Sequence, residues 1–103
     1  MIRLIRDEEI NDIFGWGFKR LVILGLNGKE IRTYLGEKVL VDELNKLASQ
    51  GFSVFNVEGI KVIDLPKGYG AWLNDKALWI TDNISREDLK EVIQFFKERE
   101  KMK

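Results

Sequence analysis

The stretch Leu21-Val22-Ile23-Leu24 is apolar at every position, and a second short run, Leu78-Trp79-Ile80, shares this property. Successive side chains of a strand point to opposite faces of a sheet, so a strand without polar positions needs cover on both faces. The two runs therefore predict strands in the middle of a sheet, with helices packed above and below it. They indicate an architecture, and no catalytic motif accompanies them.

A β-hairpin is predicted around the first run. Its strands are Lys19 to Leu26 and Lys29 to Leu35, joined by a tight turn at Asn27-Gly28. Asn-Gly is a strong hairpin signal because both central positions of a type I′ turn need positive φ. The turn places Leu24 opposite Ile31, and the polar positions of the second strand predict that it lies nearer an edge of the sheet.

The first predicted helix runs from Asp7 to Phe14. Acidic residues in its first turn favour the positive end of the helix dipole, and Gly15 provides a stop. The preceding residues, Met1 to Ile5, are compatible with a short strand.

Two further helices are predicted. Residues Lys38 to Gln50 place apolar side chains at helical spacing, and Gly51 follows at a position that terminates helices. The last helix follows Ser85, which is a favourable N-cap with Asp88 three residues later. Its buried stripe is expected to be Leu89, Val92, Ile93 and Phe96. A charged tail is expected from about Lys97.

Between these helices the sequence predicts three more strands. Phe52 to Val57 and Ile60 to Leu65 form a hairpin with a turn at Glu58-Gly59, and Pro66 to Gly70 reads as a loop. A turn at Asp75-Lys76 would complete a further hairpin. That turn sets Trp72 opposite Trp79.

Length and composition bound the function. A chain of 103 residues fits one domain, and its 17 basic and 17 acidic residues give no net attraction to nucleic acid or membranes. Abundant Lys, Glu and Ile without Cys are typical of thermophile proteins. His and Cys are both absent, which removes the commonest general base, the thiolate nucleophiles and the usual transition-metal ligands. We therefore expect no enzyme activity, no metal, no cofactor and a cytoplasmic location.

Weaker signals for chemistry in the sequence have structural explanations. The glycine-rich stretch Lys67-Gly68-Tyr69-Gly70 lacks the Gly-Lys-Ser/Thr ending of a phosphate-binding loop, and Asp75-Lys76 falls at a turn, where it does not complete a metal-dependent nuclease site. The aromatic residues Trp16, Tyr69 and Trp72 lie in the glycine-containing segments Gly15-Trp16-Gly17 and Tyr69-Gly70-Ala71-Trp72 and are candidates for a protein interface.

The order of predicted elements resembles the roadblock/dynein light chain superfamily. The residues that carry the resemblance are Leu21 to Leu26 with the Asn27-Gly28 turn, Val57-Glu58-Gly59-Ile60, and Ala77 to Thr81 before the last helix. The resemblance implies an α+β fold of the order α-β-β-α-β-β-β-α. Its mainly antiparallel five-stranded sheet would carry helices on both faces, with the first and last strands side by side at its centre.

The same resemblance implies a homodimer formed through the helix at Lys38 to Gln50 and the strand after it, associated with a small GTPase or a larger assembly. Candidate interface residues on that helix are Val39, Leu40, Leu44 and Leu47. The sequence thus predicts a non-catalytic protein–protein interaction module, a dimerising scaffold or regulator.

The alternative is a small nucleic-acid-binding regulator, virus- or plasmid-encoded. Arg3, Arg6, Lys19 and Arg20 favour it, while the acidic residues between them oppose a phosphate backbone.

Overall fold

The computed structural model describes residues 2–9 and 18–101, which form strands and helices along nearly their whole length. In chain order the elements are β1 (Ile2–Glu9), β2 (Phe18–Leu26), β3 (Lys29–Gly36), α1 (Lys38–Ser49), β4 (Val54–Val57), β5 (Ile60–Leu65), β6 (Gly68–Leu73), β7 (Lys76–Ile80) and α2 (Arg86–Lys101). Neither helix of the described part is long and apolar enough to cross a membrane.

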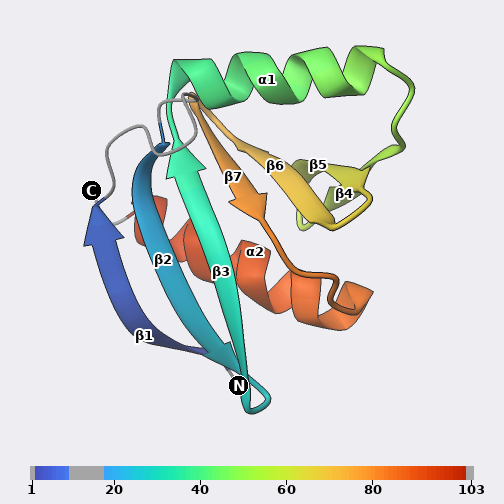
Figure 1. The fold of residues 1–103 in the computed structure, drawn as a ribbon. Helices are drawn as coiled ribbons and strands as arrows, with labels where there is room; N and C mark the ends of the chain where they lie inside the picture. Colours follow the sequence, from blue (N-terminus) through green and yellow to red (C-terminus); the bar gives the residue numbers. More distant parts are fainter. Residues whose placement is uncertain (1, 10–17, 102–103) are drawn as a thin grey trace.

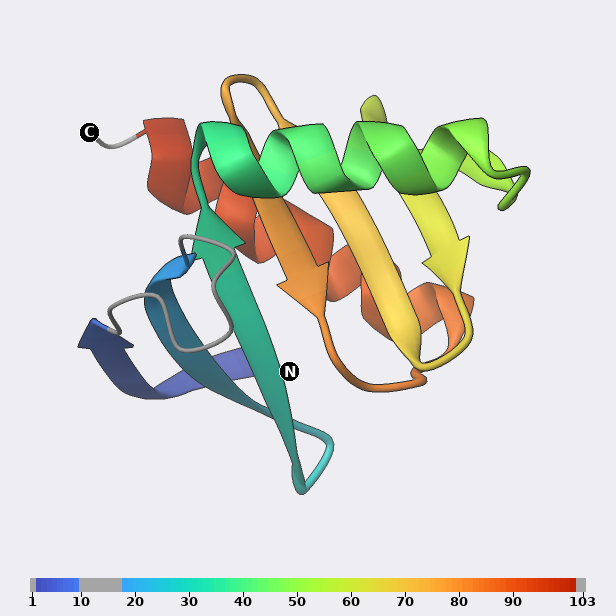
Figure 2. The same cartoon turned by 45° about the horizontal axis from the view of Figure 1, so that its top comes forward.

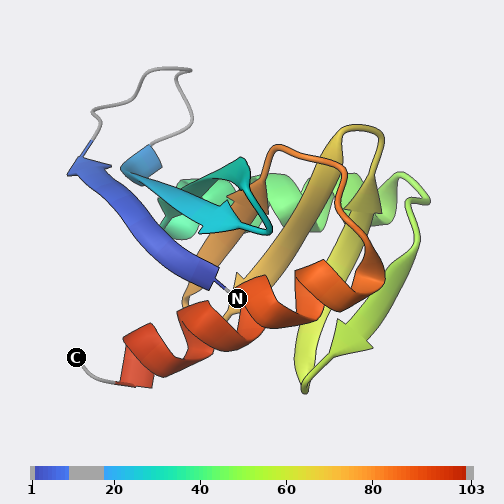
Figure 3. The same ribbon diagram turned by 90° about the horizontal axis from the view of Figure 1, so that it is seen from below.

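All seven strands of this part belong to one sheet, in the order β1-β2-β3-β7-β6-β5-β4, and every neighbouring pair is antiparallel. The helix α1 crosses one face over β3, β7 and β6, and α2 lies against the other face (Figures 1, 2 and 3). Strands β1 and β4 therefore form the two edges of the sheet.

Each helix has its own core. On the α1 side, Leu40 and Leu44 are fully buried against Ile63 and Ala77. On the α2 side, the predicted stripe is buried against β2, β3, β5, β6 and β7; it consists of Leu89, Val92, Ile93 and Phe96. Because successive side chains of a strand alternate between faces, β5, β6 and β7 supply residues to both cores.

The predicted five-stranded sheet with the order α-β-β-α-β-β-β-α is wrong. The sheet has seven strands, and the segment expected to begin a helix at Asp7 instead continues β1 as far as Glu9. Residues 10–14 of that predicted helix lie outside the described part. Pairing with β2 satisfies the backbone of Asp7–Glu9 and outweighs the local preference of acidic residues for a helix start.

The placement of the apolar runs also needs correction. Strand β7 lies in the middle of the sheet, but β3 separates it from β2, so the two runs are not side by side. Strand β3, expected nearer an edge, is an interior strand. The exposed positions Glu30 and Arg32 on β3 misled the prediction, because α1 covers only the end of β3 that leads into it.

Two hairpins have the predicted registers. Leu24 pairs with Ile31, and Phe55 pairs with Val62. Asn27 and Glu58 adopt φ of 53° and 51°, so both turns use the left-handed conformation that type I′ geometry needs. The predicted pairing of Trp72 with Trp79 is wrong.

The turn before β7 lies at Asn74-Asp75, and Trp72 pairs with Ala77. Asn74 takes the left-handed conformation with φ of 59°, which asparagine tolerates better than most residues. The turn therefore forms one residue earlier than predicted.

The predicted loop at residues 66–70 is also shorter than expected, because Gly68–Gly70 begin β6. A Cβ on Gly68 would overlap the backbone carbonyl oxygen of Ile80, and one on Gly70 would lie 2.5 Å from a Leu44 methyl carbon. These glycines allow β6 to lie close to the end of β7 and to α1, and this close packing accounts for them in place of a loop.

Helix α2 begins as predicted. The Ser85 hydroxyl accepts a hydrogen bond from the Asp88 backbone N–H at 3.1 Å. The helix continues to Lys101, past the position where a charged tail was expected. An ion pair of 3.0 Å between Lys76 and Glu100 joins its last turn to β7.

Candidate interaction site

Three of the four large apolar side chains that remain exposed in the described part of the chain lie on the two edge strands of the sheet. Among the described side chains, Leu4 (42 % exposed) and Ile5 (39 %) lie on β1, and Val54 (40 %) lies on β4; Val39 (53 %) lies on α1. The two helices cover the faces of the central strands, so the edges are where this apolar surface meets solvent. An edge strand also offers unpaired backbone N–H and C=O groups to another chain.

The β1 edge is bent by a β-bulge. Leu4 pairs with Leu24 and Arg6 pairs with Ile23, so Ile5 is the extra residue of the bulge. A Cβ on Gly25 would lie 3.1 Å from both the Arg3 Nε and the Ile5 Cδ1. Ile5 therefore shares the face of the sheet that Arg3 occupies, and Gly25 makes room for both side chains.

The β4 edge is different in chemistry. It is four residues long, contains no charged residue and exposes Val54 and Asn56. Phe55, on the opposite face from Val54, is held under the Arg86 guanidinium, whose central carbon lies 3.7 Å from the ring centroid. Lys97 on α2 donates a hydrogen bond of 2.7 Å to the Glu58 carbonyl at the end of the hairpin. Contacts from α2 thus fix this edge.

The predicted interface residues on α1 are divided by burial. Leu40 and Leu44 have no exposed surface because they form the protein's own core, and Leu47 is half-buried. Val39 alone of these four is exposed. In this structure α1 therefore offers a partner little apolar surface.

The predicted aromatic residues do not form one patch. Trp72 is half-buried on the α1 side, where its Nε1–H donates a hydrogen bond of 2.9 Å to Asn45 and the Lys61 ammonium lies 4.7 Å from its ring centroid. Tyr69 is buried on the α2 side, and its hydroxyl donates a hydrogen bond of 3.2 Å to the Ile84 carbonyl. Trp16 lies outside the described residues.

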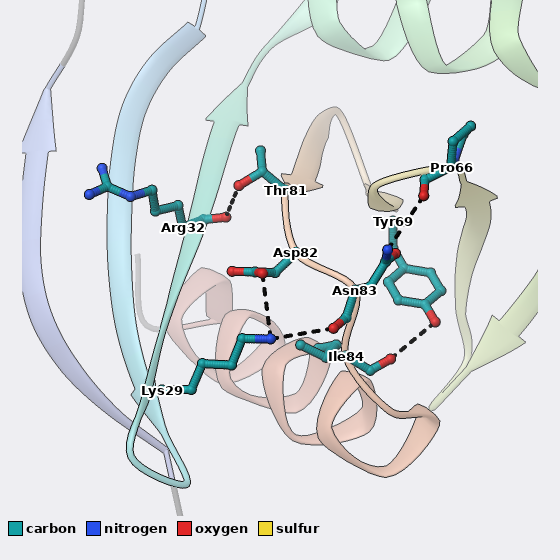
Figure 4. Close-up of polar contacts among 8 residues, drawn as sticks. All are labelled: Lys29, Arg32, Pro66, Tyr69, Thr81, Asp82, Asn83 and Ile84. Carbon is teal, nitrogen blue, oxygen red and sulfur yellow. Dashed lines mark hydrogen bonds and ion pairs between the residues drawn. The ribbon is translucent and has the colours of Figure 1, made fainter.

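A set of polar contacts holds the segment that joins β7 to α2 (Figure 4). The Lys29 ammonium lies 3.5 Å from an Asp82 carboxylate oxygen and 3.4 Å from the Asn83 carbonyl oxygen. The Asn83 side-chain amide donates to the Pro66 carbonyl at 3.4 Å, and the Thr81 hydroxyl donates to the Arg32 carbonyl at 3.1 Å. These contacts tie the segment to β3 and to the turn before β6, which is a structural role.

Several hollows on the described part of the chain are large enough for a small group, and two of them lie beside the helices. A groove of about 710 Å³ lies beside α2, and its lining includes the apolar residues Ile2 and Phe95 together with charged residues of α2. A smaller hollow of about 290 Å³ lies at the other face, between Phe52, Trp79 and Lys67. Among the described residues no group of three or more Asp, Glu, His or Cys is placed to hold a metal ion.

Among the described residues, one titratable group has a clearly shifted pKa. Burial lowers the pKa of the Arg20 guanidinium, and repulsion from Arg99 lowers it further, while Glu100 acts in the opposite direction. Arg20 lies on β2, and Arg99 and Glu100 lie in the last turns of α2. The lowered pKa thus reflects mainly the partial burial of the Arg20 guanidinium on β2, with the charge of Arg99 as a smaller contribution.

No family model, curated protein or solved structure matches this chain. The resemblance to the roadblock superfamily and the small-GTPase partner that it implies both stay predictions.

The edge residues Leu4, Ile5 and Val54 are not among the interface residues predicted from the sequence. The alternation of Ile2, Arg3 and Leu4 is a signal for a half-buried strand, and it is compatible with a short strand at Met1 to Ile5. Ile5 interrupts that alternation because it is the bulge residue. No local signal states which strands of a sheet will be its edges.

Proposed function

We propose that this protein is a non-catalytic interaction module that binds another protein chain along an open edge of its sheet. The observation that carries the proposal is the position of the exposed apolar residues Leu4 and Ile5 on β1 and Val54 on β4. A cytoplasmic location suits such a module.

Strand addition at a sheet edge explains this arrangement physically. The incoming strand forms main-chain hydrogen bonds with the edge, and side chains at alternate positions supply specificity. Leu4 and Ile5 would provide apolar contacts next to the charged residues of β1. Burying those two side chains under a partner removes apolar surface from water, which favours association.

The α1 helix is less suited to this role. Leu40 and Leu44, the residues with which a partner would be expected to pack, already fill the core beneath it. A partner that used them would have to separate α1 from the sheet. For this reason the edges replace α1 as the proposed interaction surface.

Site-specific photo-cross-linking in cells that express the protein tests the proposal. A photoreactive amino acid is introduced at Leu4, at Val54 and, as the matched control, at the exposed Glu87 on α2. We expect protein adducts from Leu4 or Val54 that are absent from Glu87, with the attachment point on the captured chain identified by mass spectrometry. Adducts to nucleic acid alone, or equal yields at all three positions, would contradict the proposal.

A further inference from the structure

The β1 edge carries an ordered charge pattern that points to one partner. Its sequence, Ile-Arg-Leu-Ile-Arg-Asp-Glu-Glu over residues 2–9, places two cations in the first part and three anions at the end. We infer that β1 pairs with β1 of a second copy of this chain, antiparallel and about a twofold axis, to form one continuous sheet. This inference rests on the proposed function and names its partner.

Antiparallel self-pairing matches opposite charges. When residue 2 of one copy lies opposite residue 9 of the other, Arg3 of each copy lies opposite Glu8 of the other. Such a pair occurs twice because the interface is symmetric. Opposite charges directly across two strands are stabilising, and like charges there are destabilising. A parallel arrangement in register would set Arg3 against Arg3 and Glu8 against Glu8, so it is disfavoured.

The β-bulge makes this register possible. A twofold axis perpendicular to the sheet keeps each residue on its own face, so paired residues must occupy the same face. In a regular strand, positions 3 and 8 are five apart and fall on opposite faces. Here Arg3 pairs with Gly25 and Glu8 pairs with Leu21, which are four residues apart on β2 and therefore on one face. The extra residue at Ile5 provides this change of phase.

The rest of the strand follows the same rule. In this register Ile2 lies opposite position 9 of the other copy, and Leu4 lies opposite position 7. Within one copy, positions 2, 4, 7 and 9 of β1 pair with positions 26, 24, 22 and 20 of β2. Those β2 positions are separated by multiples of two, so all four positions of β1 lie on one face of the sheet. Ile5 lies opposite Arg6, which pairs with Ile23 on the face that Ile5 shares with Arg3. All eight residues thus find same-face partners, and the bulge of one copy lies against the bulge of the other. No further insertion is needed to match the two strands.

The main experiment is the sedimentation velocity of the purified full chain over a dilution series, with charge-reversal variants. We expect a dimer in the wild type, and weakening by about tenfold or more in Arg3→Glu and in Glu8→Arg, because both symmetric pairs change from attraction to repulsion. The double variant Arg3→Glu/Glu8→Arg should restore the wild-type dissociation constant. Lys67→Glu, an exposed reversal at the turn before β6, is the matched control and should have no effect.

A measurement on the wild type alone guards against misfolded variants. Backbone amides of residues 2–9 should exchange more slowly with deuterium as the protein concentration rises, while those of β4 stay unchanged. A monomer at every concentration, single reversals without effect, or a double variant that fails to regain dimerisation would each overturn the inference. If the purified chain is monomeric while Leu4 still cross-links to a different protein in cells, the self-pairing fails and the proposed function stands.

Discussion

Replacement of Gly68 by alanine is expected to be among the most destabilising single changes in this protein. Gly68 adopts φ of 142°, and a Cβ there would overlap the backbone carbonyl group of Ile80. The carbonyl belongs to the main chain at the end of β7, so no side-chain rotation can relieve the overlap. The strand β6 must instead move away from the segment that follows β7.

The magnitude has two parts. The backbone conformation alone costs an alanine about 1–3 kcal/mol, because this region is nearly restricted to glycine. Separating the start of β6 from β7 disturbs the pairing of Tyr69 with Ile80 and loosens two side chains that are 9 % and 0 % exposed. That disturbance adds about 2–3 kcal/mol from weakened hydrogen bonds and packing. We therefore expect a loss of about 3–6 kcal/mol in the free energy of unfolding.

Gly59→Ala is the matched control. Gly59 also has a positive φ, 79°, but a Cβ there meets no atom within 4 Å. Only the conformational cost remains, about 1–2 kcal/mol. Urea denaturation followed by circular dichroism gives both free energies of unfolding. If Gly68→Ala costs no more stability than Gly59→Ala, the contact between β6 and the Ile80 carbonyl does not restrict position 68 to glycine, which would refute this prediction.

Three further changes test the packing, the cap and the ion pairs by the same denaturation assay. Leu44→Ala should lower the free energy of unfolding by about 2–5 kcal/mol, because the Leu44 side chain is fully buried between α1 and the sheet. Val39→Ala on the same helix should change it by less than about 0.5 kcal/mol, because Val39 is exposed. Equal losses would mean that α1 does not pack as described. Ser85→Ala should cost about 1 kcal/mol, because the hydrogen bond from the Asp88 N–H to the Ser85 hydroxyl is lost. Ser53→Ala, at an exposed position before β4, should be near neutral. Equal free energies of unfolding for the two variants would mean that the cap has no energetic role. Glu100→Gln should lose about 1–2 kcal/mol, because its ion-pair partner Lys76 is only 21 % exposed and would be left without that charge partner. Asp42→Asn, in the exposed pair with Lys38, should lose less than about 0.5 kcal/mol. A larger loss for Asp42→Asn than for Glu100→Gln would contradict the expected effect of burial.

The parts of the fold that the sequence predicts correctly depend on residues close together in the chain. The Asn27-Gly28 and Glu58-Gly59 hairpins need only a two-residue turn and matching neighbours, and α2 needs only its cap and its apolar spacing. The turn at Asn74-Asp75 was predicted one residue too late, because Asp75-Lys76 is also a pair of polar residues that includes an aspartate, a residue common in turns.

The parts that were predicted wrongly depend on distant contacts. The acidic residues Asp7 to Glu9 favour a helix locally, yet they pair with residues of β2 that lie 11 to 15 positions later in the chain. In the sequence, Gly68 and Gly70 are typical of a loop. In the fold they are needed because the Ile80 carbonyl and the Leu44 side chain leave no room for a Cβ at these positions. The candidate site was missed for the same reason, because the position of Leu4 at an edge follows from the order of all seven strands.

The two sheet edges must also differ in chemistry if self-pairing is to stop at a dimer. If both β1 and β4 accepted another copy, sheets would join edge to edge without closing, and an open filament would form. Strand β1 carries both signs of charge in an order that matches itself only in the antiparallel direction, so a twofold pair satisfies it and leaves no β1 edge free. Strand β4 is half as long and uncharged, so it offers a second copy few backbone groups and no charge pairs. The length of β4 therefore acts against growth of the sheet, while the charge order of β1 favours a closed dimer.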